Sequence, residues 1–201
     1  PNIRHENSAK LSKKPSGVGS VGLTYRKTEQ SHLLIGVEGV SRSDERRFAL
    51  SVLASALGGG MSSRLFQEIR EKRGLAYSVY SYIQQFAGAG SLAFYAGCAP
   101  AKTSEVIKII RSITEDVAVN GLSEEEISRA KGSVSGALVL SQEDTGSQMS
   151  RIGKSELVYG DVLGFDEILK RIDAVNSDQL KEIASDLLLQ PSTLAIVGPF
   201  K

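Results

Sequence analysis

The sequence has little of the chemistry on which many enzymes depend: a single cysteine and two histidines in 201 residues. Cys98 lies in an apolar run, which excludes an internal disulfide framework and a CxxC metal pair and indicates a buried structural thiol. His5 and His32 form neither H-x-x-E-H nor H-E-x-x-H, whereas a zinc site normally needs at least three protein ligands. No G-x-S-x-G motif is present either. We therefore predict no metal ligand and no catalytic residue in this chain.

An excess of one charge and a long apolar run are also absent. Lys plus Arg number 24 against 23 Asp plus Glu, so the net charge is +1 and nothing favours nucleic acid. No apolar run approaches the roughly 18 residues that cross a bilayer. The chain starts at "PNIRHENSAK" without Met or the apolar core of a signal peptide. We expect a fragment or processed subunit of a longer protein, located in the cytoplasm or, alternatively, in the mitochondrial matrix or periplasm.

Hydrophobic periodicity divides the chain into a polar linker, residues 1–17, and one domain, residues 18–201. Alternating or β-branched runs predict strands, and these are 20–27, 31–40, 75–86, 90–98 and 192–199. Amphipathic runs predict helices, and these are 43–57, 62–72, 101–120, 123–140, 143–160, 164–175 and 177–189. Strands in adjacent pairs with helices gathered between them predict an α+β sandwich, a mostly antiparallel sheet covered by helices on one face.

Local signals sharpen several of these elements. Val106, Ile110, Ile113 and Val117 form one helical stripe. Ser123 and Glu126 have the spacing of a capping box at the start of the next helix. The glycines at 58–60 are expected to end their helix in the left-handed conformation. The short connection between strands 20–27 and 31–40 allows a hairpin-like or neighbouring antiparallel pair.

Three glycine-rich segments resemble phosphate-binding loops, and each has a simpler interpretation. "GVGSVG" at 17–22 matches G-x-G-x-x-G, but a linker precedes it and a strand follows, where a dinucleotide site needs a strand and then a helix. "GAGSLA" at 88–93 lies between two strands. "GGGMSSR" at 58–64 lacks the Lys-Ser/Thr end of a phosphate loop. Nucleotide binding is a minor alternative.

The segment "RLFQEIREKRGLAYSVYS" from residue 64 joins a charged helix to a tyrosine-rich strand across Gly74. Arg70 falls in the last turn of the helix and Tyr77 near the start of the strand, so both side chains can converge. A guanidinium and a phenol there would donate hydrogen bonds to a peptide carbonyl or a developing oxyanion. The alternative, which spacing leaves open, is an arginine paired with its own acidic neighbours.

An ordered series of motifs resembles the second half of the insulinase (pitrilysin) superfamily of zinc metallopeptidases, nearest to its bacterial and mitochondrial-processing-peptidase branch. The series covers residues 18 to 200 and includes "ALGGGMSSRLFQEIREKRGLAYSVYS", "YAGCAP", "GLSEEEISRAKGSVSGALVL", "SQEDTGSQMSRIGKSELVYG" and "LAIVGPF". The resemblance implies a LuxS/processing-peptidase-like metallohydrolase fold. It also implies two similar halves that enclose a chamber, the first of which holds zinc through H-x-x-E-H.

In that family the second half supplies an arginine and a tyrosine that reach substrate near the zinc, and Arg70 and Tyr77 occupy the matching places. The resemblance thus implies a substrate-binding, non-catalytic C-terminal domain of a metalloendopeptidase that cleaves extended peptides. Its partners would be the zinc-binding N-terminal half, in the same protein or another subunit, and the peptide. The alternative is a structural or assembly subunit of the same fold, as in respiratory complexes. Because such a domain is built to cover another half, we also expect self-association as a homodimer when it is alone.

Overall fold

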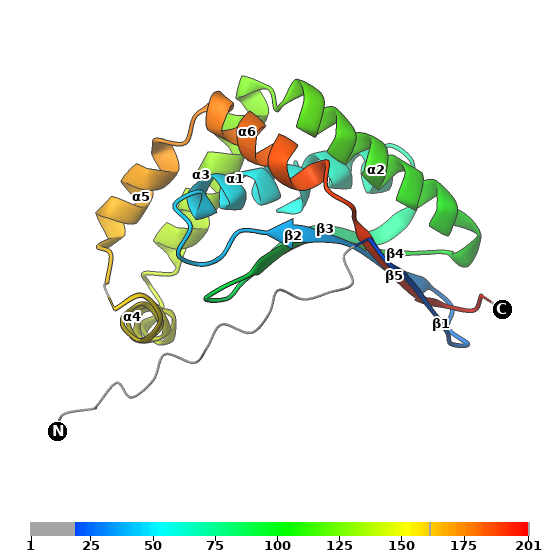
Figure 1. Cartoon of the computed structure of the whole chain (residues 1–201), viewed down its shortest axis with the longest axis horizontal. Helices are drawn as coiled ribbons and strands as arrows, with labels where there is room; N and C mark the ends of the chain where they lie inside the picture. The colour runs from blue at the N-terminus through cyan, green and yellow to red at the C-terminus, as the bar shows by residue number, and fades with distance from the viewer. Residues whose placement is uncertain (1–18, 161, 201) are drawn as a thin grey trace.

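A computed structural model describes residues 19–160 and 162–200. In this part of the chain five strands form one sheet in the order β1-β5-β2-β4-β3. The strands are β1 (Val21–Tyr25), β2 (Ser31–Gly39), β3 (Ala76–Gln85), β4 (Gly90–Cys98) and β5 (Thr193–Gly198). Helices gather over one face of the sheet (Figure 1), which confirms the predicted α+β sandwich. The predicted linker, residues 1–17, lies outside the described residues.

The sheet is mostly antiparallel, but the predicted pairing of its first two strands is wrong. β1 runs parallel to β5, and β5 lies between β1 and β2 and pairs with both. Every residue of β1 is exposed, so β1 contributes little apolar burial and occupies an edge. β5 occupies an inner position between β1 and β2. In agreement with that position, its Leu194 is buried. The strand order of the sheet thus depends on β5, which comes from the far end of the chain. A local sequence pattern does not reveal such a long-range pairing.

The helices follow the sequence closely, and they pack mainly through their apolar stripes. They are α1 (Arg47–Gly58), η1 (Phe66–Glu71), η2 (Pro100–Lys102), α2 (Thr103–Asn120), α3 (Glu124–Leu140), α4 (Thr145–Tyr159), α5 (Phe165–Asp173) and α6 (Ser177–Leu188). The predicted α2 stripe is buried: Val106, Ile110 and Val117 have no exposed surface. The predicted capping box at Ser123 and Glu126 is present. No helix of the described residues is long and apolar enough to span a membrane.

The glycines at the end of α1 serve close packing instead of a left-handed turn. Gly59 has φ −85°, so the predicted left-handed conformation is wrong there. A Cβ at Gly58 would lie 2.4 Å from the backbone nitrogen of Ser81. The hydroxyl of Ser81 donates a 2.6 Å hydrogen bond to the carbonyl of Ala54. Glycine therefore lets the end of α1 approach β3, the strand that follows the candidate site.

Helix α4 is 15 residues long and none of its residues is buried. Met149 and Leu157 are 71% and 88% exposed. Arg47 lies over the ring of Tyr159, with Cζ 5.1 Å from the ring centroid, and connects the end of α4 to α1. The apolar surface agrees with a domain that covers another part of a larger protein; self-association stays a prediction.

Candidate functional site

Arg70 lies on η1, a turn of π-helix rather than the ordinary α-helix expected for residues 62–72. The N–H of Lys72 donates to the carbonyl of Gln67 at 2.9 Å, a bond across five residues. A π-turn holds one residue more than an α-turn and is frequent at functional sites. The wider turn changes the direction in which the side chains of its last residues point. Arg70 is one of these residues.

Gly74 then turns the chain from η1 into β3. Its φ of +60° is a left-handed conformation that glycine adopts without steric cost. The N–H of Gly74 donates to the carbonyl of Arg70 at 3.0 Å, and the N–H of Leu75 donates to that of Ile69 at 2.9 Å. These bonds satisfy carbonyls at the helix end and fix the angle between helix and strand. Leu75 and Ile69 are buried, so the corner is anchored in the core.

Tyr77 stands at a β-bulge near the start of β3. Ala76 pairs with Cys98 and Ser78 pairs with Gly97, so Tyr77 is the extra residue without a partner on β4. A bulge redirects a side chain and is common beside active sites. The side chain of Tyr77 is accordingly 73% exposed although it lies within a strand.

The π-turn and the bulge bring the two predicted side chains together. The Cζ atom of Arg70 lies 5.1 Å from the ring centroid of Tyr77 and 4.8 Å from that of Phe66. Both distances are within the range of cation–π contact. A guanidinium that rests on rings uses its flat faces, so the N–H donors at its edges stay available. We call this pair the Arg70–Tyr77 site.

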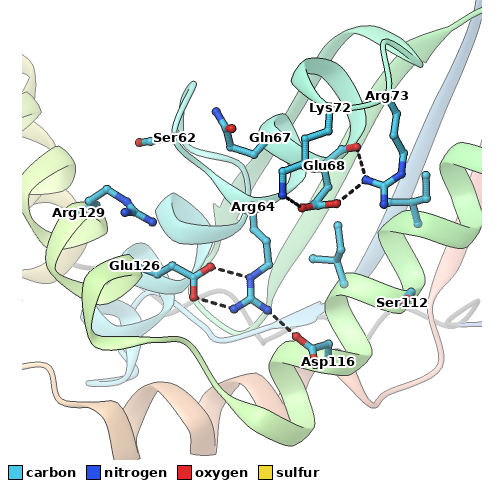
Figure 2. A pocket seen from close by; sticks show the side chains of 12 residues that line it. Ser62, Arg64, Gln67, Glu68, Lys72, Arg73, Ser112, Asp116, Glu126 and Arg129 are labelled. Carbon is cyan, nitrogen blue, oxygen red and sulfur yellow. Dashed lines mark hydrogen bonds and ion pairs between the residues drawn. The ribbon is translucent and has the colours of Figure 1, made fainter.

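The other cations of the same segment bind carboxylates. Arg64 donates two 2.7 Å hydrogen bonds to Glu126 and a third of 2.7 Å to Asp116. Lys72 and Arg73 both bind Glu68. Figure 2 shows these ion pairs.

In contrast, the side chain of Arg70 forms no hydrogen bond or ion pair with any residue in 19–160 or 162–200, and the same holds for the hydroxyl of Tyr77. The alternative of an arginine paired with its acidic neighbours is therefore not what this part of the structure contains.

The three residues Arg64, Asp116 and Glu126 form what we call the Arg64 cluster. It lies in an open cavity of about 620 Å³ between the start of η1, α2 and α3, which Arg70 and Tyr77 do not line. Hydrogen bonds from Arg64 lower the pKa of Glu126 to about 2 against its burial, and Ser123 adds to that shift. Arg64 uses three of its donors inside this cluster, so it ties α2 and α3 to the segment before η1 and offers little to a ligand.

The described residues contain no group of three or more His, Cys, Asp or Glu side chains placed to hold a metal ion. Cys98 is buried, as predicted, and its thiol lies 3.4 Å from the hydroxyl of Ser31. The hydrogen-bond donors of the Arg70–Tyr77 site can orient and polarise an acceptor.

Comparison with known proteins relates this chain to a protease family. Residues 5–134 match the family described as the peptidase M16 inactive domain. The chain belongs to this family. An uncharacterized zinc protease from Streptomyces coelicolor is 52% identical over 183 residues, which are 91% of this chain and 40% of that protein. The M16 proteases are the zinc metallopeptidases that the sequence motifs resemble, so that prediction is confirmed.

Solved structures share the fold. The peptidase M16 inactive domain from Pseudomonas fluorescens superposes with a TM-score of 0.86 at 21% identity, over 96% of this chain and 46% of that one. A chain of complex III2 from Candida albicans, solved with Inz-5 bound, gives a TM-score of 0.83 at 20% identity, over 98% of this chain and 50% of that one. This chain spans 40% of the Streptomyces relative's length.

Proposed function

We propose that this inactive domain is the substrate-binding part of a zinc metalloendopeptidase, in which Arg70 and Tyr77 hold the backbone of an extended peptide. The observation that carries the proposal is a guanidinium that rests on two rings and has no ion pair within residues 19–160 and 162–200, beside a phenol that is 73% exposed. The relatives named zinc proteases support it, because they extend well beyond this chain. Zinc, the nucleophilic water and the general base would come from another half of the protein or from a partner subunit.

The two donors suit a peptide carbonyl at the moment when it gains negative charge. A guanidinium is always ionised and presents several N–H groups in a fixed plane, and a phenol adds one O–H donor. Donors fixed in place before the reaction stabilise an oxyanion without reorganising. The stack on Phe66 and the Gly74 corner supply that rigidity. A zinc ion in the other half would act as the Lewis acid and activate water.

Peptide turnover by the complete zinc-loaded protein tests the proposal. Arg70→Ala and Tyr77→Phe should each lower kcat/KM by roughly one to two orders of magnitude, because each removes a donor to the oxyanion. Arg129→Ala is a matched control, since Arg129 pairs with the exposed Glu125 on the surface of α3. The control should cleave at the rate of the unmodified protein. Unchanged turnover by both site variants would exclude the assignment.

A structural or assembly subunit is the second candidate, and the fold shared with a chain of complex III2 supports it. In that case the parent protein would have no active first half. The sequence that precedes this domain distinguishes the two functions, because an active protease needs H-x-x-E-H there. A parent protein with that motif and measurable peptide hydrolysis would reject the structural function.

A further inference from the structure

The sheet has a second face, opposite the one over which α1, α2 and α6 lie (Figure 1). Side chains alternate along a strand, and Leu33, Ile35 and Val37 of β2 are buried on the helix side. Leu34 and Gly36 therefore point to the second face.

Strand register identifies their neighbours on that face. Leu34 pairs with Tyr95, which pairs with Tyr80. Gly36 pairs with Ala93, which pairs with Tyr82. Two adjacent rows of side chains thus meet on the second face. We call them the tyrosine patch: Leu34, Gly36, Tyr80, Tyr82, Ala93 and Tyr95.

The three rings of the patch lie together and one of them is held firmly. The ring centroids of Tyr80 and Tyr95 are 4.8 Å apart, and those of Tyr80 and Tyr82 are 6.3 Å apart. Nδ1 of His32 and the hydroxyl of Tyr95 share a 2.7 Å hydrogen bond. Burial raises the pKa of Tyr95, so its phenol stays neutral at ordinary pH. These contacts make a fixed aromatic wall.

Beside that wall Gly36 and Ala93 carry the two smallest side chains. Ala93 is only 4% exposed, so the accessible part of this floor is at Gly36. The atom nearest to a Cβ built on Gly36 is the carbonyl oxygen of Leu92, at 4.0 Å, so the space above Gly36 is open. None of the six residues is charged. An uncharged floor with aromatic edges favours an apolar side chain. An anionic side chain would lose its hydration and would approach Glu38, the next residue of β2 on the same face.

We propose that the tyrosine patch binds an apolar side chain of the same extended peptide whose backbone the Arg70–Tyr77 site holds. This inference rests on the proposed function. Tyr77, Tyr80 and Tyr82 all belong to β3. Ala76 and Val79, which flank the bulge, are both buried on the helix side, so Tyr77 lies on the second face with Tyr80 and the two surfaces adjoin. At about 3.3 Å per residue, Tyr80 and Tyr82 lie roughly 10 and 16 Å along the strand from Tyr77. An extended peptide covers those distances in about three to five residues, so the patch would select a side chain at that offset from the bound carbonyl.

Peptide binding by the full-length protein tests the proposal, with zinc removed by a chelator so that nothing is cleaved. Fluorescence anisotropy gives Kd for labelled peptides in which one position at a time is Leu, Ser or Asp. At one position Leu should bind about tenfold or more tightly than Ser, the usual effect of filling an apolar site. Gly36→Val should abolish that preference and leave the Ser peptides unaffected.

Gly22→Val is the matched control. It places the same side chain in open space on β1, at the opposite edge of the sheet, and should keep the preference for Leu. A Gly36→Val protein that still prefers Leu to Ser as strongly as the unmodified protein overturns the inference. A lower unfolding temperature of full-length Gly36→Val with unchanged peptide selectivity also overturns it, because the patch would then be covered by the rest of the protein.

Arg70→Ala separates this inference from the proposed function. It should weaken all peptides together and preserve the ratio between Leu and Ser. If Arg70→Ala binds every peptide normally while Gly36→Val loses its selectivity, the backbone site is wrong and the patch remains a peptide-binding surface. If Arg70→Ala weakens every peptide and Gly36→Val changes nothing, the patch alone is wrong.

Discussion

Arg64 and Arg70 lie on the same charged segment and have opposite surroundings. Arg64 donates three hydrogen bonds to two carboxylates on α2 and α3. Arg70 lies on the rings of Phe66 and Tyr77 and meets no carboxylate among the described residues. Residue type and sequence neighbourhood are nearly the same, so the tertiary contacts distinguish the two.

The comparison distinguishes Arg64, whose hydrogen bonds stabilise the fold, from Arg70, whose guanidinium N–H donors are not used by any described residue. In the Arg64 cluster, removal of one partner leaves the others only partly compensated, so the protein loses stability. Removal of Arg70 leaves no carboxylate of the described residues uncompensated and loses only its contacts with the rings, which are worth about 0.5–1 kcal/mol at an exposed site. The π-turn and the β-bulge are the irregular elements that keep Arg70 and Tyr77 outside the network.

The largest stability effect is expected for Glu126→Gln. Glutamine can still accept the hydrogen bond from the N–H of Ser123 in the capping box, so the change mainly removes the charge opposite Arg64. The free energy of unfolding should fall by about 1–3 kcal/mol, measured by chemical denaturation. Glu125→Gln is the control, because the neighbouring Glu125 is exposed and its pair with Arg129 contributes at most about 1 kcal/mol. Equal losses in the two variants would contradict the structural role.

Acid should weaken the Arg64 cluster in a defined pH window. The folded pKa of Glu126 is lowered to about 2 from an ordinary value of 4.5. A carboxylate with a lowered folded pKa stabilises the protein above its unfolded pKa, and this contribution disappears as pH falls from about 4.5 toward 2. Unfolding free energies measured across that range should fall less steeply in Glu126→Gln than in the unmodified protein. The same slope in both proteins would show that Glu126 does not titrate there.

The smallest effect is expected at Tyr77. Tyr77→Phe keeps the ring beneath Arg70 and removes a hydroxyl that has no partner in the described part of the chain. The free energy of unfolding should stay within about 0.5 kcal/mol of the unmodified value, although peptide turnover falls. A larger loss in thermal or chemical unfolding would mean that the hydroxyl supports the fold, and the contrast with the Arg64 cluster would weaken.

Local patterns predicted those features that local interactions determine. The stripe of α2 and the capping box at Ser123 depend on residues a few positions apart, and both are present. The insertion of β5 beside β1 depends on residues at opposite ends of the chain, so the pairing prediction failed. The left-handed turn after α1 failed for a similar reason, because Gly58 is required by a distant residue, Ser81.

The candidate site was predicted only in part. Spacing around Gly74 placed Arg70 and Tyr77 at one corner, but the π-turn and the bulge were missed. The bulge left one signal in the sequence. The apolar residues Ala76 and Val79 are three positions apart, which breaks the two-residue period of a strand, and the structure shows both of them buried. The tyrosine patch had no such signal. The patch can be recognised only once the registers of β2, β3 and β4 are known.

The most direct test of the account is the peptide turnover of Arg70→Ala and Arg64→Ala in the complete protein, each corrected for its folded fraction. We predict a roughly 10- to 100-fold loss of kcat/KM for Arg70→Ala, with a free energy of unfolding lowered by no more than about 1 kcal/mol. For Arg64→Ala we predict the reverse pattern. Full turnover by folded Arg70→Ala, or an equal loss of turnover in a normally stable Arg64→Ala, would contradict it.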